Sequence, residues 1–375
     1  MTAEVEHAFW ELLRAGLWKK PPMLTAKLSD EQWGEVMKYA KRQTLIGVLF
    51  DGMLHLPVDL QPTEDIRMKW FWKVNRIELA NRKQNQVLVK ITEKLEEKGI
   101  KTMVLKGQSY ALLYPQPLHR QPGDIDLFVG EKNLEAVSQW IETWGMTDSK
   151  HSYHSLHINA KWQGVSIELH RTAAVFGSFT KQRQFVKWSE QVLEQSTFTF
   201  TPMDEKEEVH IPNTVFNALY VFYHLFFHFV HGGVGLRQLC DWACMLHVNH
   251  NKINQQELKQ RLNCFGLLNA WQVFGYLLVH HIGLPQEEFP FYKETKKKAS
   301  IILEDIMEQG NFGHSAEKQF SNDPNYLARK RKNFFFHAKR YLKTIRLFPA
   351  LGLEAFGFFL LERGKHFFTD YFNAK

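Results

Sequence analysis

Apolar residues recur at helical spacing through the first hundred residues of the chain. Residues 1–60 contain about three short amphipathic segments, and Asp30 stands where an N-cap is expected. Residues 63–98 keep this period with no internal Gly or Pro, and Gly99 follows as a C′ residue. The pattern predicts a helical N-terminal region that leads into one long helix.

The period shortens to that of strands between residues 100 and 171. Five segments there have strand character: residues 100–105, 125–129, 146–150, 155–162 and 165–171. Gly164 separates the last two, which indicates a hairpin. Helices are predicted from Gly107 through Leu113 and over residues 132–144. This order of elements implies a small mixed sheet with helices packed against it.

Helical periodicity dominates from about residue 180 onward, apart from a short predicted strand at residues 197–201. Further helices are predicted over residues 213–231, 236–248, 254–263, 266–281, 294–308, 326–347 and 351–371. Residues 311–325 form the expected flexible loop. We therefore expect an α+β protein with three parts. These are an N-terminal helical region over 1–61, a core with the mixed sheet over 62–201, and a C-terminal helical domain over 202–375.

The composition fits a large globular core, since the 375 residues are 44% hydrophobic and 23% charged. The net charge of +7 favours polyanionic partners. We expect no signal peptide and no membrane span, because the longest apolar run, residues 347–361, is interrupted by Pro349 and Glu354. The three cysteines, Cys240, Cys244 and Cys264, fit neither a metal knuckle nor a disulfide framework, which favours a reducing cytoplasm.

Two aspartates lie at the start of the predicted strand 125–129. Alternation in a strand places Asp124 and Asp126 on one face and Ile125 and Leu127 in the core. Neighbouring carboxylates repel unless a cation lies between them, and Mg²⁺ prefers such oxygen ligands together with substrate phosphates. The pair predicts a metal-dependent phosphoryl or nucleotidyl transfer site.

A third carboxylate lies in the segment VSIELHR at residues 165–171. Alternation places Ser166, Glu168 and His170 on one face of this strand. Glu168 stands between two apolar residues and is costly to bury unless it is paired or bound to a metal. Two interpretations stay open: a ligand that completes the site, or an edge strand on which Glu168 faces water.

A second candidate feature is the turn at Lys106 and Gly107, between a predicted strand and a predicted helix. Backbone N–H groups at a helix N-terminus bind phosphate, and Gly allows close approach. The ammonium group of Lys106 can add a positive point charge that attracts the same phosphate. Arg120, in the proline-rich loop before the aspartates, can clamp a triphosphate or lie on the surface.

These features together resemble the nucleotidyltransferase superfamily of polymerase β-like folds. The stretch VLKGQSYALLYPQPLHRQPGDIDLFV, followed by IELHR, is similar to a bacterial family of nucleotidyltransferase-like proteins. The shared motifs are the Lys-Gly turn, the loop arginine, the G-D-I-D-L strand and the later acid-x-His strand. The resemblance covers residues 100–171 and continues more loosely into HFVHGGVGLRQLCDWACML.

The resemblance implies a fold, a reaction and a set of site residues. Asp124, Asp126 and Glu168 would hold two divalent ions, Mg²⁺ or Mn²⁺, and would be the catalytic residues. The turn residues Lys106, Gly107, Gln108 and Ser109, with Arg120, would bind the phosphates of an NTP such as ATP. A nucleoside monophosphate would pass to an unidentified acceptor (a protein, an RNA or a small molecule), and pyrophosphate would leave.

The sequence departs from the superfamily pattern at the phosphate turn and at the third acid. Gln108 stands where a serine is usual, Ser109 comes one place later, and Glu168 replaces the more frequent aspartate. A second hypothesis is therefore a catalytically inactive protein that keeps the fold and binds nucleotide or RNA.

Three features of the helical half carry weaker hypotheses. His224, His228 and His231 share a helix face, which suits zinc but more often indicates packed histidines. Arg237 and Asp241 most simply form a surface pair, although the resemblance would place them, with His231, beside the cleft. Residues 329–346 mix basic and aromatic side chains; they predict a solvated helix face or, alternatively, contact with an anionic partner such as RNA or a membrane surface.

Overall fold

The structure is a computed structural model that describes residues 2–141, 143–148, 157–311 and 326–373. Its N-terminal helices are α1 (Ala3–Trp18), α2 (Asp30–Arg42) and α3 (Ile46–Leu54). Helices α1 and α3 pack closely because glycines line their contact: a Cβ at Gly16 would lie 1.9 Å from Val48 O. The predicted cap at Asp30 is wrong by one residue. Ser29 caps α2 in a capping box with Gln32, which satisfies two backbone N–H groups, whereas Asp30 is the first helical residue.

The short 3₁₀ helix η1 (Val58–Leu60) leads into α4 (Glu64–Glu96), which confirms the predicted long helix. This helix is amphipathic, but several polar side chains face inward. Asn81, Gln84 and Asn85 are buried, and each donates a hydrogen bond to a backbone carbonyl outside α4. Helix α4 thereby holds the loop before β2 and the segment at Met203.

The sheet has five strands within the described residues, in the order β1-β2-β5-β4-β3. The strands are β1 (Met103–Val104), β2 (Ile125–Phe128), β3 (Thr147–Asp148), β4 (His157–Trp162) and β5 (Val165–His170). Strands β2 and β5 are parallel and the other pairs antiparallel, so the predicted mixed sheet and the β4–β5 hairpin are confirmed. The first predicted strand, 100–105, is shorter than expected. The short helix α5 (Gln108–Ala111) also ends before the predicted Leu113.

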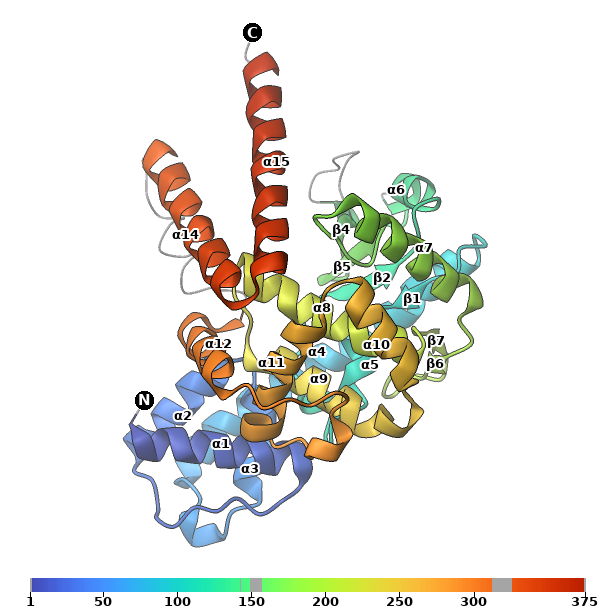
Figure 1. Cartoon of the computed structure of the whole chain (residues 1–375). Helices are drawn as coiled ribbons and strands as arrows, with labels where there is room; N and C mark the ends of the chain where they lie inside the picture. The colour runs from blue at the N-terminus through green and yellow to red at the C-terminus, as the bar shows by residue number, and fades with distance from the viewer. Residues whose placement is uncertain (1, 142, 149–156, 312–325, 374–375) are drawn as a thin grey trace.

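The two faces of the sheet have different surroundings. Ile125 and Leu127 of β2 lie in a hydrophobic cluster with α4 and with α6 (Leu134–Ile141), as predicted for core residues. Asp126 points to the opposite face, which α8 (Thr214–His231) covers through His224 and Tyr220. The strand pattern thus turns the acidic side chains toward α8, and Figure 1 shows α8 next to the strands of the sheet.

The helical half confirms the predicted helices. It contains α7 (Phe179–Gln195), α9 (Leu236–Asn249), η3 (His250–Lys252), α10 (Gln255–Cys264), α11 (Leu268–Leu277), the π-helix η4 (Leu278–Ile282), η5 (Gln286–Glu288), α12 (Lys296–Gln309), α14 (Tyr326–Leu347) and α15 (Pro349–Asn373). A small antiparallel pair, β6 (Thr199–Phe200) and β7 (Val209–His210), precedes α8. The expected loop at 311–325 lies outside the described residues except for Asn311.

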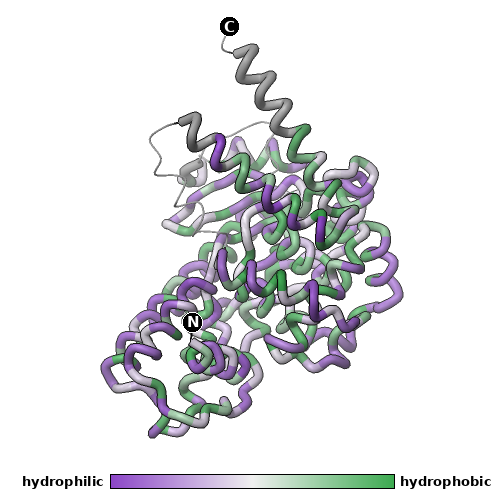
Figure 2. Tube along the Cα trace, turned by 60° about the vertical axis from the view of Figure 1, so that its left-hand side comes forward, coloured by the Kyte–Doolittle hydropathy of each residue, from purple (hydrophilic) through white to green (hydrophobic). Residues whose placement is uncertain are grey.

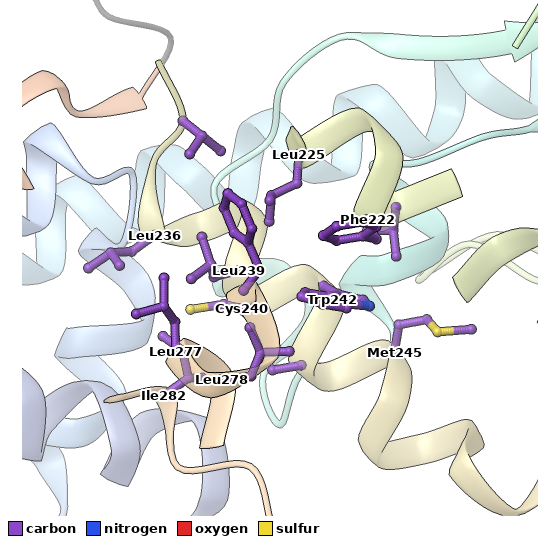
Figure 3. Close-up of a cluster of buried hydrophobic side chains, with 14 of the residues drawn as sticks. Phe222, Leu225, Leu236, Leu239, Cys240, Trp242, Met245, Leu277, Leu278 and Ile282 are labelled. Carbon is purple, nitrogen blue, oxygen red and sulfur yellow. The ribbon is translucent and has the colours of Figure 1, made fainter. Parts of the chain in front are cut away.

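Aromatic and aliphatic side chains fill the interior of this half. Phe222 of α8, Trp242 of α9 and Trp271 of α11 meet with ring centroids 4.7–5.3 Å apart. Figure 3 shows Phe222 and Trp242 beside Cys240 and the leucines of η4 and α11. Cys240 and Cys244 are free and buried, as predicted.

Among the helices that the structure describes, no single one is long and apolar enough to cross a membrane. Helices α10 and α11–η4 reach the necessary apolar length only as a pair, across a 116° bend.

Candidate active site

The turn after β1 brings Lys106 directly to the acidic strand. Lys106 Nζ lies 3.1 Å from Asp126 Oδ1 and 2.8 Å from His224 Nε2. Burial alone would lower the pKa of Lys106, but Asp126, Asp124 and Glu168 together raise it, so the side chain is an ammonium ion. Gly107 has φ +79°, a conformation that favours glycine, and a Cβ there would lie 3.4 Å from Asp124 O.

The structure brings the three predicted carboxylates together. Asp126 pairs with Glu168 in the parallel register of β2 and β5, and Asp124 directly precedes β2. One carboxylate oxygen from each residue lies within 4.8 Å of the others. Strand β5 lies between β2 and β4, so the alternative of an exposed edge strand for Glu168 is wrong.

The surroundings of the two aspartates shift their pKa values in opposite directions. The charge of Asp126, followed by burial, raises the pKa of Asp124. Burial also acts to raise the pKa of Asp126, but Lys106 and His170 outweigh it and hold the pKa below the ordinary value. Asp126 is fully buried, and its Oδ2 has no hydrogen-bond partner among the described residues.

Two histidines complete the polar side of this cluster. His170 Nε2 lies 3.0 Å from Asp126 Oδ1 and 3.4 Å from Glu168 Oε2. Burial alone would lower the pKa of His170, but the hydrogen bonds and charges of these carboxylates raise it to about 9. His157 stands opposite His170 in the β4–β5 register, with ring centroids 5.2 Å apart.

The donor atoms fit a divalent cation. The oxygens of Asp124, Asp126 and Glu168 suit a hard ion such as Mg²⁺ or Mn²⁺, and the unpartnered Asp126 Oδ2 is a buried lone-pair donor without a proton donor to satisfy it. His157, Glu168 and His170 also have ligand atoms within 4.8 Å of one another. This second set contains imidazole nitrogens, which suit Mn²⁺ or Zn²⁺ better than Mg²⁺.

Two cavities meet at the carboxylates. The first is lined by Gly107, Arg120, Asp126, Arg237 and other residues between the turn and α9. The second is larger, about 320 Å³, and lies between β5 and α8. Lys106, Asp124, Tyr220 and His224 line both cavities, which therefore adjoin at the carboxylates.

The phosphate-turn residues lie in different surroundings. Lys106 and Gly107 line the first cavity, whereas the side chain of Gln108 donates to Asn81 and Asn85 of α4. Ser109 is buried, and its Oγ has no hydrogen-bond partner in the described part of the chain. The turn thus reaches the first cavity through Lys106 and Gly107, whereas Gln108 and Ser109 do not line it.

Arg120 is held by the helical half. Its Nε and one terminal nitrogen lie 2.7 and 2.8 Å from the carboxylate of Asp241, which also accepts from Tyr114 at 2.7 Å. The other terminal nitrogen has no partner among the described residues. The predicted surface pair of Arg237 with Asp241 is wrong, because both residues are buried and Arg237 donates to Gln121 O at 2.9 Å.

The three histidines of α8 do not form a metal site in the described structure. His224 and His228 approach each other, with their Nε2 atoms 3.0 Å apart, but His231 stacks on Phe227 and bonds to its carbonyl. Burial lowers the pKa of all three, to about 3 for His228 and about 4 for His231. The prediction that these are packed histidines therefore holds for the described structure. His224 and His228 face the larger cavity.

Sequence reasoning did not single out His157, Tyr220 or Asn81. The position of His157 could have been predicted from the turn at Gly164. In an antiparallel hairpin, a register that pairs Val165 with Trp162 also pairs His170 with His157. Tyr220 and Asn81 come from helices far away in the sequence, and their periodicity shows only that they face inward.

Residues 29–283 match the model of the family described as "Uncharacterised nucleotidyltransferase". Since the match spans more than half of the chain, the protein belongs to this family. No curated protein matches the chain at a significant level.

One similar solved structure is an antigenic nucleotidyltransferase-like protein from Paracoccidioides brasiliensis. It is 14% identical, the alignment covers 57% of this chain and 95% of the other, and the TM-score is 0.34.

Proposed function

We propose that this chain is a metal-dependent nucleotidyltransferase of the polymerase β type. It transfers a nucleoside monophosphate from an NTP, with ATP as the first candidate, to a hydroxyl-bearing acceptor. The observation that carries the proposal is the fully buried Asp126, whose Oδ2 lacks a partner in the described structure beside the carboxylates of Asp124 and Glu168. These three residues would hold Mg²⁺ or Mn²⁺.

Each residue of the cluster has a role in this reaction. Bound divalent ions supply charge stabilisation to the attacking and leaving oxygens. Lys106 presents an ammonium ion where the two cavities meet, and Gly107 allows the backbone to approach a phosphate. Arg120 and Arg237 also line the first cavity, and because Asp241 neutralises Arg120, the three residues together leave one positive charge there.

The bond changes follow from this arrangement. The acceptor oxygen bonds to the α-phosphorus while the bond from that phosphorus to the bridging oxygen breaks. Pyrophosphate departs, and the acceptor proton is released to solvent. Within this proposal, His170 is a positioning residue, because it orients Asp126 and Glu168 from 3.0 and 3.4 Å.

The acceptor must bring a hydroxyl to the carboxylates, whether it is a protein, an RNA or a small molecule. The 320 Å³ cavity supports a ligand with an apolar body, since Tyr220, Tyr223 and Phe227 line it beside Asp124 and Glu168. We place the reaction in the cytoplasm, in keeping with three free cysteines.

Calorimetric titration of the wild type and Glu168→Gln with Mn²⁺ and ATP tests the metal site. We expect affinity to fall by more than roughly 100-fold, because even substitutions in the outer shell of metal sites cost 10–100-fold. Glu31→Gln, an exposed acid on α2, is the matched control. Equal affinity of the wild type and Glu168→Gln would exclude the metal role.

A second candidate is a binding protein that no longer transfers nucleotide. Two observations favour it: Lys106 already neutralises Asp126, and the Gln108 side chain points to α4. Incubation with α-labelled NTPs and a cell lysate separates the candidates. Label transferred to an acceptor by the wild type, and lost in Glu168→Gln, supports catalysis; retention without transfer supports binding.

A further inference from the structure

Helices α14 and α15 form a hairpin that rises from the body of the molecule (Figure 1). Their facing sides pack through Tyr341, whose ring lies 4.9 Å from Phe359 and 5.8 Å from Phe356. At the base, Arg340 and Lys343 both pair with the buried Asp305 of α12. These contacts fix one side of α14 and leave the opposite side to solvent.

The solvent side of α14 carries a stripe of cationic and apolar side chains. Its members are separated by four, four, three and four positions, which places them on one helix face. They are Arg331, Phe335, Lys339, Leu342 and Arg346, and all are exposed. Phe335 and Leu342 keep 63% and 64% of their surface accessible, so they are not part of the core of the described structure.

Helix α15 adds apolar surface to the same hairpin. Leu353, Leu360 and Leu361 are exposed and lie seven and eight positions apart, again on one helix face. Figure 2 shows hydrophobic and hydrophilic segments alternating along the described turns of α14, and mainly hydrophobic segments along those of α15. The surface of a soluble protein rarely exposes this many large apolar side chains together unless they bind a partner.

The charge of the hairpin selects among possible partners. The sequence from Tyr326 to Leu347 contains no Asp or Glu, so the stripe of a second copy would meet it with like charge. RNA would use the cations and the ring of Phe335, but Leu342 and the exposed leucines of α15 offer no planar face on which bases stack. An anionic bilayer accepts both classes of side chain, since its phosphates bind cations and its acyl boundary buries Leu and Phe.

We infer that the α14–α15 hairpin docks on an anionic phospholipid surface. Phe335 and Leu342 enter the boundary between headgroups and acyl chains, and Arg331, Lys339 and Arg346 bind lipid phosphates. The helices lie on the surface rather than cross it. This inference goes beyond the proposed reaction and does not depend on it.

Vesicle co-sedimentation of the full chain tests the inference. We expect binding to phosphatidylcholine vesicles that contain phosphatidylglycerol, none to pure phosphatidylcholine, and weaker binding as salt rises. The triple variant Arg331→Gln/Lys339→Gln/Arg346→Gln should lose roughly five-fold in affinity per charge. Phe335→Ser/Leu342→Ser should lose roughly 10-fold or more.

Matched controls on α4 separate the stripe from general charge and apolarity. Lys73→Gln/Arg76→Gln/Lys90→Gln removes three exposed cations, and Leu79→Ser removes an exposed leucine. Both should bind vesicles like the wild type. Circular dichroism and calorimetry of ATP with Mn²⁺ should be unchanged in every variant, which keeps a failure of docking distinct from a failure of the proposed function.

Three results would overturn the inference. One is absence of binding to anionic vesicles at low salt. A second is loss of vesicle binding in the α4 controls as large as in the stripe variants. The third is a wild-type dimer that both stripe variants dissociate, since this would assign the stripe to a second copy of the chain.

Discussion

The two aspartates of the acidic cluster, Asp124 and Asp126, have opposite electrostatic effects on stability. Asp126 touches Lys106 and His170, so its ionised form stabilises the fold, whereas Asp124 lies beside a like charge. The pKa of Asp124 is above its ordinary value of 3.8. In the metal-free protein, the contribution of Asp124 to stability therefore falls as pH rises from 3.8 through that pKa, and its ionised carboxylate is destabilising at neutral pH.

We predict opposite effects of two matched substitutions in the metal-free protein. Asp124→Asn should raise the melting temperature, because it removes the repulsion between Asp124 and Asp126. The free energy of unfolding should rise by an amount on the order of 1 kcal/mol. Asp126→Asn should lower stability by about 3 kcal/mol or more, because it leaves Lys106 and His170 beside a neutral amide. Differential scanning fluorimetry at neutral pH, with a chelator present, measures both changes.

Added Mn²⁺ extends the same experiment. The wild type should gain thermal stability, and both variants should gain less, because each has lost a ligand oxygen. A metal-free Asp124→Asn that melts at or below the wild type would contradict the predicted repulsion. Equal stabilisation of all three proteins by Mn²⁺ would contradict the ligand assignment.

At the scale of elements, the helices and strands were predictable because their periodicity is local. The 33-residue α4 and the β4–β5 hairpin came directly from spacing and from Gly99 and Gly164. The proximity of Asp124, Asp126 and Glu168 was also foreseeable, since alternation gave their faces and the resemblance gave their pairing.

Contacts between distant elements were not predictable. Arg237 and Asp241 suggested a surface pair, but Asp241 instead binds Arg120, 121 positions away in the sequence. No local pattern shows which buried charge meets which. Likewise, the sequence predicts that Gln108 is a phosphate-turn residue, but in the structure its side chain bonds to Asn81 and Asn85 of α4.

The Arg120–Asp241 pair predicts a large stability effect between these elements. Asp241→Asn should cost about 3–5 kcal/mol, because the charge of the buried Arg120 would remain without its carboxylate. Replacement of both residues, as Arg120→Met/Asp241→Leu, should recover most of the loss. Urea denaturation measures each free energy of unfolding.

The control for this experiment is an exposed pair. Lys69→Met, which breaks the pair with Asp65 on α4, should cost about 0–1 kcal/mol. Losses of the same size in Lys69→Met and Asp241→Asn would show that the buried pair contributes no more than a surface one.

At the scale of the whole molecule, α4 connects the N-terminal helices to the candidate site. Trp70 of α4 donates to Ile46 O of α3 at 2.9 Å. Further along the helix, Asn81 donates to Leu118 O and Arg120 O, and Gln84 donates to Gly123 O. The loop that positions Asp124 is thus held by the same helix that anchors α3.

His119 joins three parts of this framework and predicts a pH dependence. Its ring nitrogens lie 2.6 Å from Asp51 of α3 and 2.8 Å from Glu78 of α4. Burial alone would lower the pKa of His119, but the two carboxylates outweigh it and raise the pKa. Burial raises the pKa of Asp51 despite His119, yet the flanking pair of carboxylates still favours the imidazolium.

His119→Gln should therefore destabilise the protein in a pH-dependent way. A group with a raised folded pKa contributes its full stability below its unfolded value, about 6.5, and loses it as pH rises through the folded value. The difference in free energy of unfolding between wild type and His119→Gln should be largest near pH 6 and shrink as pH rises above the unfolded value into the alkaline range. Urea denaturation across this range measures it. A difference that stays constant or grows with pH would show that His119 acts by packing alone, and that charge does not join α3 and α4 to the loop of the site.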